Sequence, residues 1–311
     1  MVDFFHEAQI SLVVFTLLSQ IVVGAIWIVT VGEFLTSLPA FRQRLGRLVT
    51  WTGVPVLGLA LAFSTTHLGR PLYAWRALRA LGTSWVSREI WAFSILFGLL
   101  CLYAYLWYRD ERGARHRRLV AVLTSIAGVL GIITQSQLYM IPGRPQWNHF
   151  STILLFGATA MMLGALLVGV ITTLIAHREA PLRAMYQHLA ASLLGAAALY
   201  GIGFIARIIY LAQGQDAAGV ILGGAATGAE TVGTALTVGW TIVGANPFLS
   251  SMELLLAVAV PLVAGLTLVT ICWHKGSIKL ANRLIHSTLG LVFVGTLAGR
   301  VIFYLTGKPW F

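Results

Sequence analysis

His67 and Glu89 could carry out chemistry together, because they stand near the two ends of one polar connection. A neutral imidazole can take a proton from a hydroxyl group near neutral pH. A carboxyl group that is held partly out of water can act as the next proton acceptor. The two residue types in this arrangement predict a site of proton transfer.

The connection reads STTHLGRPLYAWRALRALGTSWVSREI at 64–90, and it also holds four arginines and two tryptophans. Phospholipid headgroups can hold such arginines at a membrane surface while their stems lie along apolar groups. A partner protein or a charged ligand would also account for them. The pattern alone leaves these explanations open.

Composition predicts the elements that must position these residues. The chain has 311 residues, 58% of them hydrophobic and 10% charged, with a mean hydropathy of +0.84. A soluble domain carries roughly a quarter charged residues. We therefore predict an all-α membrane protein, a single multi-pass domain over 1–311, because apolar segments of about 20 residues cross a bilayer as helices. A bundle of eight transmembrane helices is expected, over 8–32, 46–66, 90–108, 119–140, 150–176, 184–211, 251–273 and 282–306.

The segment 214–250 is the least certain part of this plan. It holds eight glycines and carries Glu230 near its centre. A charge in the middle of a lone span is costly. A loop or a re-entrant segment is therefore preferred over a ninth span.

The basic residues predict how the chain is oriented. Thirteen of them fall in or beside the loops 33–45, 109–118, 177–183 and 274–281, whereas six fall on the opposite side. Cytoplasmic loops are enriched in Lys and Arg. Both termini are therefore expected on the outer side of the membrane. These short loops also explain the net charge of +11 without nucleic acid as a partner.

A candidate site emerges from residues that are expected at one depth near the outer face. Ionisable residues inside spans are functional candidates by default. Each also has a plainer explanation: an acidic first helical turn, arginines that snorkel outward, or an aromatic belt that includes Trp147. Their shared depth favours a common site. The residues are His67, Glu89, Tyr139, His149, Arg207, Glu253 and Arg300.

Oxidation of a lipid-soluble quinol would suit such a site, since its protons and electrons must separate. Apolar helices would hold the ring and tail, and arginines would stabilise negative charge. The alternatives are a haem of cytochrome b type, for which His67 and His149 share a depth, and a small-solute transporter, which favours polar groups near the midplane. Cys101 and Cys272 lie in apolar spans and cannot build an iron–sulfur cluster.

At these residues the chain resembles a family, the membrane-anchor subunits of dimethyl sulfoxide reductase-type complexes. The stretch HLGRPLYAWRALRALGTSWVSREI at 67–90 is similar to the family's HLG-x-P-x-x-A followed by S-x-E-I. LYMIPGRPQWN at 138–148 is a second, weaker match. The eight-helix plan with both termini outside is also similar, so the resemblance covers essentially the whole chain.

The resemblance implies a multi-pass anchor of a bacterial inner membrane, with both termini on the periplasmic side, that oxidises menaquinol near the periplasmic face. It implies two partners, an iron–sulfur subunit that receives the electrons and a molybdopterin catalytic subunit. His67 and Glu89 match the residues associated with the quinol site, and Arg79 matches a basic residue less closely. With Tyr139, Arg207 and Arg300 they form the expected quinol-binding set. Quinol and membrane lipid are the expected small-molecule partners, and no haem or metal is expected in this chain.

Overall fold

The computed structural model describes residues 10–35, 39–66, 77–109, 114–141, 147–176, 179–221, 252–274 and 276–306. Within these residues, eight helices are long and apolar enough to cross a membrane. The predicted all-α class and the number of spans are therefore confirmed. Seven of them are α2 (Ile10–Leu35), α3 (Pro39–Thr66), α4 (Trp85–Arg109), α5 (Ala114–Tyr139), α6 (Ser151–Ile175), α7 (Glu179–Ile221) and α11 (Ile278–Thr306). The other span, Met252–Trp273, contains a short π-helical turn followed by α10 (Val260–Trp273).

Several helices begin earlier than the apolar segments indicated. α3 begins at Pro39 and α5 at Ala114, each with an extra turn that carries arginines. Pro39 fits this position because the first helical residue needs no N–H partner. Hydropathy locates only the part of a helix that lipid must cover, so it does not predict these charged helical turns. α7 continues to Ile221, so the segment 214–250 begins as helix, whereas 222–251 lie outside the described residues.

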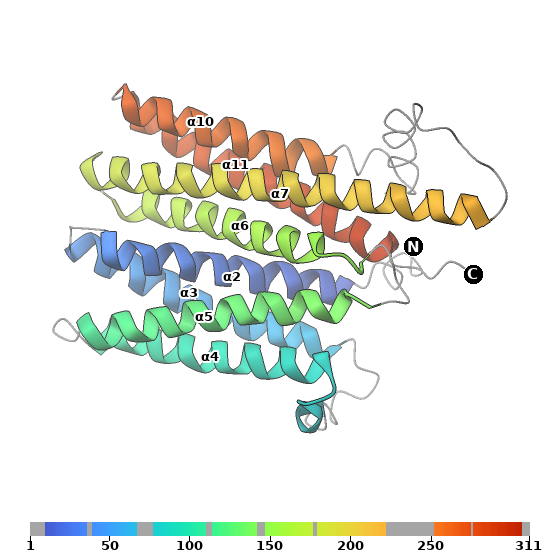
Figure 1. Cartoon of the computed structure of the whole chain (residues 1–311). Coiled ribbons are helices and arrows are strands. Elements are labelled where there is room, and N and C mark those ends of the chain that lie inside the picture. Colours follow the sequence, from blue (N-terminus) through green and yellow to red (C-terminus); the bar gives the residue numbers. More distant parts are fainter. Residues whose placement is uncertain are drawn as a thin grey trace.

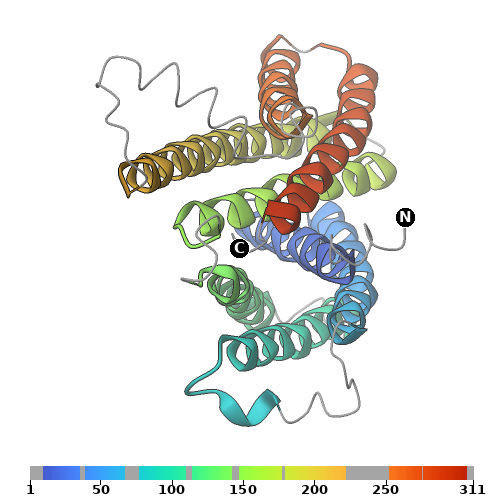
Figure 2. The same ribbon diagram turned by 90° about the vertical axis from the view of Figure 1, so that its right-hand side faces the viewer.

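The eight helices form two groups of four (Figure 2). In the first group α2, α3, α4 and α5 pack in chain order, and α5 returns to α2. In the second group α6, α7, α10 and α11 do the same, and α11 returns to α6. A short π-helical turn, Leu255–Ala259, leads into α10. We call these sets the first and the second helix group.

The two groups meet where α2 crosses α6. A Cβ atom added to Gly24 would lie 1.7 Å from the carbonyl oxygen of Ala160, and one added to Gly164 would lie 2.1 Å from the backbone of Gly24. Small residues at such crossings let helix backbones approach closely in membranes. This contact fixes the position of the first group against the second.

Both ends of the bundle hold polar side chains. α2 begins and α11 ends at the same end of the molecule, on the right of Figure 1, which we call the Ile10 end. The opposite end, where α2 finishes, is the Leu35 end. Glu89, Tyr139 and Arg300 all lie toward the Ile10 end, as their places on α4, α5 and α11 require.

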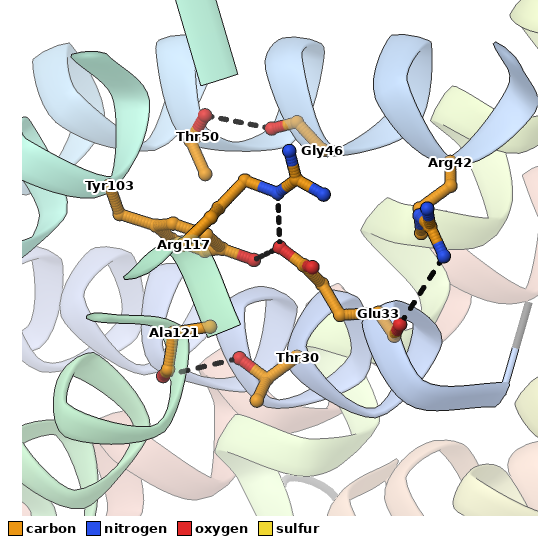
Figure 3. Close-up of polar contacts among 8 residues, drawn as sticks. All are labelled: Thr30, Glu33, Arg42, Gly46, Thr50, Tyr103, Arg117 and Ala121. Carbon is orange, nitrogen blue, oxygen red and sulfur yellow. Dashed lines mark hydrogen bonds and ion pairs between the residues drawn. The ribbon is translucent and has the colours of Figure 1, made fainter. Parts of the chain in front are cut away.

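A buried ion pair lies at the Leu35 end of the first group (Figure 3). The Arg117 Nε atom lies 3.0 Å from Glu33 Oε1, and the Tyr103 hydroxyl donates to the same oxygen at 3.0 Å. The Arg117 guanidinium also stacks over the ring of Trp107 at 4.0 Å. Because Glu33, Tyr103 and Arg117 come from α2, α4 and α5, the cluster fastens three helices together.

Candidate functional site

The start of α4 is fixed by side chains that bond to the preceding loop. Ser84 caps the helix, with its Oγ atom 3.5 Å from the backbone nitrogen of Ser87. Arg88 donates to the carbonyl groups of Leu81 and Gly82 at 3.0 and 2.8 Å. Trp91 donates to a third carbonyl in this loop. Arg88 is thus engaged in holding the loop.

These contacts place Glu89 deeper in the helix than expected. α4 begins at Trp85 rather than at 90, so Glu89 lies in the second turn, and the first turn holds no acidic residue. The interpretation of Glu89 as an acidic residue of the first turn is therefore wrong. Its side chain is buried instead, at 5% exposure, which calls for another explanation.

Glu89 lines a cavity of about 320 Å³ at the Ile10 end of the first group. Ligand cavities typically enclose about 300–1,000 Å³ and are mostly apolar with a few polar groups. Here the wall is mainly apolar, and Glu89 supplies its one carboxyl group. Glu89 Oε1 is buried and has no hydrogen-bond partner among the residues that the structure describes. The wall is formed by Leu12, Phe15, Leu61, Ser64, Thr65, Leu78, Val86, Glu89, Ile90, Phe93, Ser94, Leu138 and Tyr139.

Tyr139 connects this cavity with the second helix group. Its hydroxyl lies 2.6 Å from the hydroxyl of Tyr304 in α11. Its ring is surrounded by other rings, including Trp147 and Phe303 at 5.4 Å each. Tyr139 and Trp147 are both buried, at 4% exposure, so they belong to the protein interior and not to a lipid-facing aromatic belt.

Arg207 and Arg300 lie in the second group and point inward. Their exposed fractions are 3% and 5%, which excludes snorkelling to the membrane surface. Both line a small cavity of about 10 Å³ together with Glu253 and Tyr200. The Tyr200 hydroxyl donates to Glu253 Oε1 at 2.7 Å. This second site therefore combines a buried carboxyl group with two cations.

Arg300 also reaches back toward the first group. Its Nη2 atom donates to Gln20 Oε1 at 2.8 Å, and Gln20 Nε2 donates to Gln135 Oε1 at 3.0 Å. The guanidinium stacks over the ring of Phe156 at 3.7 Å. Helices α2, α5 and α11 are thus joined by one buried polar layer, one turn below the Tyr139–Tyr304 contact, and α6 packs against it through Phe156.

Two other predicted residues, Arg79 and His149, are absent from the wall of the cavity. His67 lies outside the described residues. Arg79 is an exposed residue of the turn before α4 and is not part of the cavity wall. His149 stacks on Tyr210 with ring centres 4.4 Å apart and contacts the Ser151 hydroxyl at 2.9 Å. Partial burial lowers the pKa of the His149 imidazole below its ordinary value.

The sequence analysis does not identify two residues of the buried polar clusters, Tyr304 and Glu33. Tyr304 was overlooked because an aromatic residue near a helix end usually signals only the membrane interface. Glu33 falls in a predicted loop, although the apolar residues around it indicate that the span continues.

A group of three or more metal-binding side chains does not occur in the described part of the chain. The absence of haem and metal remains a prediction.

Comparison with known proteins identifies the family. Residues 5–305 match the sequence profile described as the DMSO reductase anchor subunit (DmsC). The chain belongs to this family. As a family member with eight apolar helices, it is a multi-pass membrane anchor.

Individual relatives match shorter segments. The anaerobic dimethyl sulfoxide reductase chain YnfH of Escherichia coli is 32% identical over 162 residues, which cover 51% of this chain and 56% of the relative. An anaerobic dimethyl sulfoxide reductase chain of Haemophilus influenzae is 29% identical over 156 residues, 50% of this chain and 56% of that protein. A sulfite dehydrogenase subunit of Allochromatium vinosum is 33% identical over 109 residues, 33% of each protein. The chain spans about half the length of the first two relatives.

Proposed function

We propose that this chain oxidises menaquinol in the cavity at the Ile10 end and passes the electrons to an iron–sulfur subunit. The observation that carries the proposal is the Glu89 carboxyl group. It lies buried in the wall of a largely apolar cavity of about 320 Å³, and its Oε1 atom has no hydrogen-bond partner within the described residues. A buried carboxyl oxygen without a partner is costly unless a ligand supplies one.

A quinol supplies the missing partner. Its hydroxyl group can donate to Glu89, while the ring lies against Phe15 and Phe93 of the cavity wall. Tyr139 lines the same cavity, and its hydroxyl can bond to the quinol oxygen. Apolar walls suit the ring and the isoprenoid tail, since these groups gain by leaving water.

The reaction removes two protons and two electrons from each quinol. Glu89 accepts one proton as the quinol O–H bond breaks, and His67, beyond the described residues, is the other expected acceptor. The electrons leave one at a time for an iron–sulfur cluster in the partner subunit, which passes them to a molybdopterin subunit. In this scheme, the chain provides the quinol site and the anchor.

The Ile10 end faces the periplasm of a bacterial inner membrane in this proposal. The excess of basic residues in the loops of the Leu35 end supports this orientation. The iron–sulfur partner would dock at the Ile10 end, close to the cavity. Arg79 is exposed at this end, and Arg88 holds its own loop.

Turnover of the assembled complex tests the proposal. Glu89→Gln keeps the shape of the side chain but cannot accept a proton, so quinol-dependent turnover should fall about 100-fold or more. Glu33→Gln is the matched control, because it changes a buried carboxyl group at the other end of the same helix group. Turnover is measured per assembled complex. Wild-type turnover in Glu89→Gln would refute the assigned role.

A further inference from the structure

A second buried carboxyl group, Glu253, lies in the second helix group at the same end of the bundle. It is 1% exposed and accepts a hydrogen bond from the Tyr200 hydroxyl at 2.7 Å. A Cβ atom added to Gly299 would lie 2.7 Å from Glu253 Oε1. The carboxyl group therefore rests against the backbone of α11, in space that only a glycine leaves open.

The backbone beside Glu253 is irregular. The π-helical turn Leu255–Ala259 follows it almost directly. A Cβ atom added to Gly295 would lie 2.4 Å from the Cβ atom of Leu256, so this turn is also seated against α11. Turns of this kind inside helices occur frequently at functional sites. The local geometry thus fixes the carboxyl group at one place on α11.

Cations and hydroxyl groups surround this carboxyl group. Arg207 and Tyr200 face it from α7, and Arg300 faces it from α11, whereas α6 contributes the neutral Thr159. Glu253 Oε2 has no hydrogen-bond partner among the described residues, and its side chain borders the cavity of about 10 Å³. A polar cavity of this size can hold one water molecule.

A polar connection leads from the quinol cavity toward Glu253. Tyr139 lines that cavity, and its hydroxyl meets the Tyr304 hydroxyl at 2.6 Å. Arg300 lies one turn before Tyr304 on the same face of α11. It also lines the small cavity together with Tyr200 and Glu253. The same cation therefore serves both sites.

We propose that Glu253 is a second proton acceptor for quinol oxidation, reached from the cavity through Tyr139 and Tyr304. This inference rests on the proposed function. The first quinol proton goes to Glu89 and the second to the Tyr139 oxygen, as Tyr139 passes its own proton to Tyr304. From Tyr304 the proton reaches Glu253 through a water molecule in the small cavity, whose wall includes Arg300 and Phe303, the residue next to Tyr304 in the chain. The two electrons go to the iron–sulfur cluster of the partner subunit, so that protons and electrons balance.

Arg300 has a defined part in this transfer. A guanidinium group stays protonated in proteins, so Arg300 does not carry the proton. It stabilises the negative charge that appears on Tyr139 or Tyr304 while a proton is in transit. Its bond to Gln20 holds it in place. The arrangement gives the second quinol proton a route through Tyr139 and Tyr304 in place of transfer to His67.

Infrared difference spectra of the intact complex, recorded on quinol oxidation, test the proposal. Protonation of Glu253 should give a carboxylic acid C=O band that Glu253→Gln removes and Glu253→Asp shifts. Turnover of Glu253→Gln should fall about 100-fold, with quinone-analogue binding unchanged. A spectrum that keeps the same band in Glu253→Gln, or wild-type turnover in that variant, overturns the proposal.

Tyr304→Phe tests the route even where Glu253→Gln does not assemble. It removes the hydroxyl contact with Tyr139, so turnover should fall about tenfold or more and its solvent deuterium isotope effect should change. Tyr186→Phe is the matched control, because it removes another buried tyrosine hydroxyl that bonds to α11, at Asn282. An unchanged rate and isotope effect in Tyr304→Phe would contradict the route.

The result also separates this inference from the proposed function. If Glu89→Gln abolishes turnover while the Glu253 and Tyr304 variants behave as wild type, only the second acceptor is refuted. If none of these variants changes turnover, the quinol site itself is refuted.

Discussion

The hydroxyl groups of Tyr139 in α5 and Tyr304 in α11 lie 2.6 Å apart. This contact joins two helix groups that otherwise meet mainly where α2 packs on α6. One partner lines the cavity that contains Glu89, and the other lies one turn from Arg300. The wall of the candidate quinol cavity comes from the first group. The second group contacts this wall through the Tyr304 hydroxyl.

The α2–α6 crossing predicts a large difference between two glycines of one helix. Gly164→Ala adds a Cβ atom where the backbone of Gly24 lies 2.1 Å away, whereas a Cβ atom at Gly157 meets no described atom within 4 Å. Gly164→Ala should destabilise the protein by about 1–3 kcal/mol or more. Gly157→Ala should be neutral or stabilising by up to about 1 kcal/mol. Thermal unfolding of the detergent-purified chain compares them, and equal stabilities would argue against the close crossing.

The ion pair at the Leu35 end predicts a loss of stability without a loss of chemistry. Glu33→Ala leaves the buried Arg117 without its carboxyl partner, which should cost about 3–5 kcal/mol. Tyr103→Phe removes only the hydroxyl that donates to Glu33, so a smaller loss of about 1.5–3 kcal/mol is expected. The same unfolding assay measures both. Turnover per assembled complex should stay unchanged, and a specific loss of turnover would assign this cluster a role in the reaction.

His149 predicts a pH dependence that can be followed directly. Partial burial lowers its pKa, so the folded chain binds fewer protons than the unfolded chain between that lowered value and the ordinary value of about 6.5. The stability that the His149 imidazole contributes is present at a pH above its ordinary pKa. It is lost as the pH falls through the lowered pKa of the folded state. NMR of histidine-labelled protein, assigned with His149→Gln, should show titration below the ordinary value. Titration above it would contradict the structure around the ring.

Much of the fold could be predicted from the sequence, because lipid imposes long apolar segments that are easily recognised. The eight spans and the shared end of Glu89, Tyr139 and Arg300 follow from these segments and their alternating directions. Helix ends are predicted less accurately, since turns rich in arginine, such as the first turn of α5, are helical although they are not apolar. Hydropathy carries no information about them.

The composition of the site could be predicted only in part. Glu89 and Tyr139 do share a cavity, yet Arg207 and Arg300 lie beside a different carboxyl group, Glu253. Which residues at one depth face each other depends on the packing of helices that are distant in sequence. The pairing of Tyr139 with Tyr304 is of this kind, and a single sequence does not encode it in any visible pattern.

Photoaffinity labelling of the intact complex tests the central claim most directly. An azido-menaquinone analogue is illuminated in the complex, and the labelled peptides are identified by mass spectrometry. We predict labelling of peptides from the start of α4 and the end of α5, around Glu89 and Tyr139, which unlabelled menaquinone suppresses. Labelling confined to α6, α7 and α10, or labelling that menaquinone does not suppress, would contradict a quinol site in this cavity.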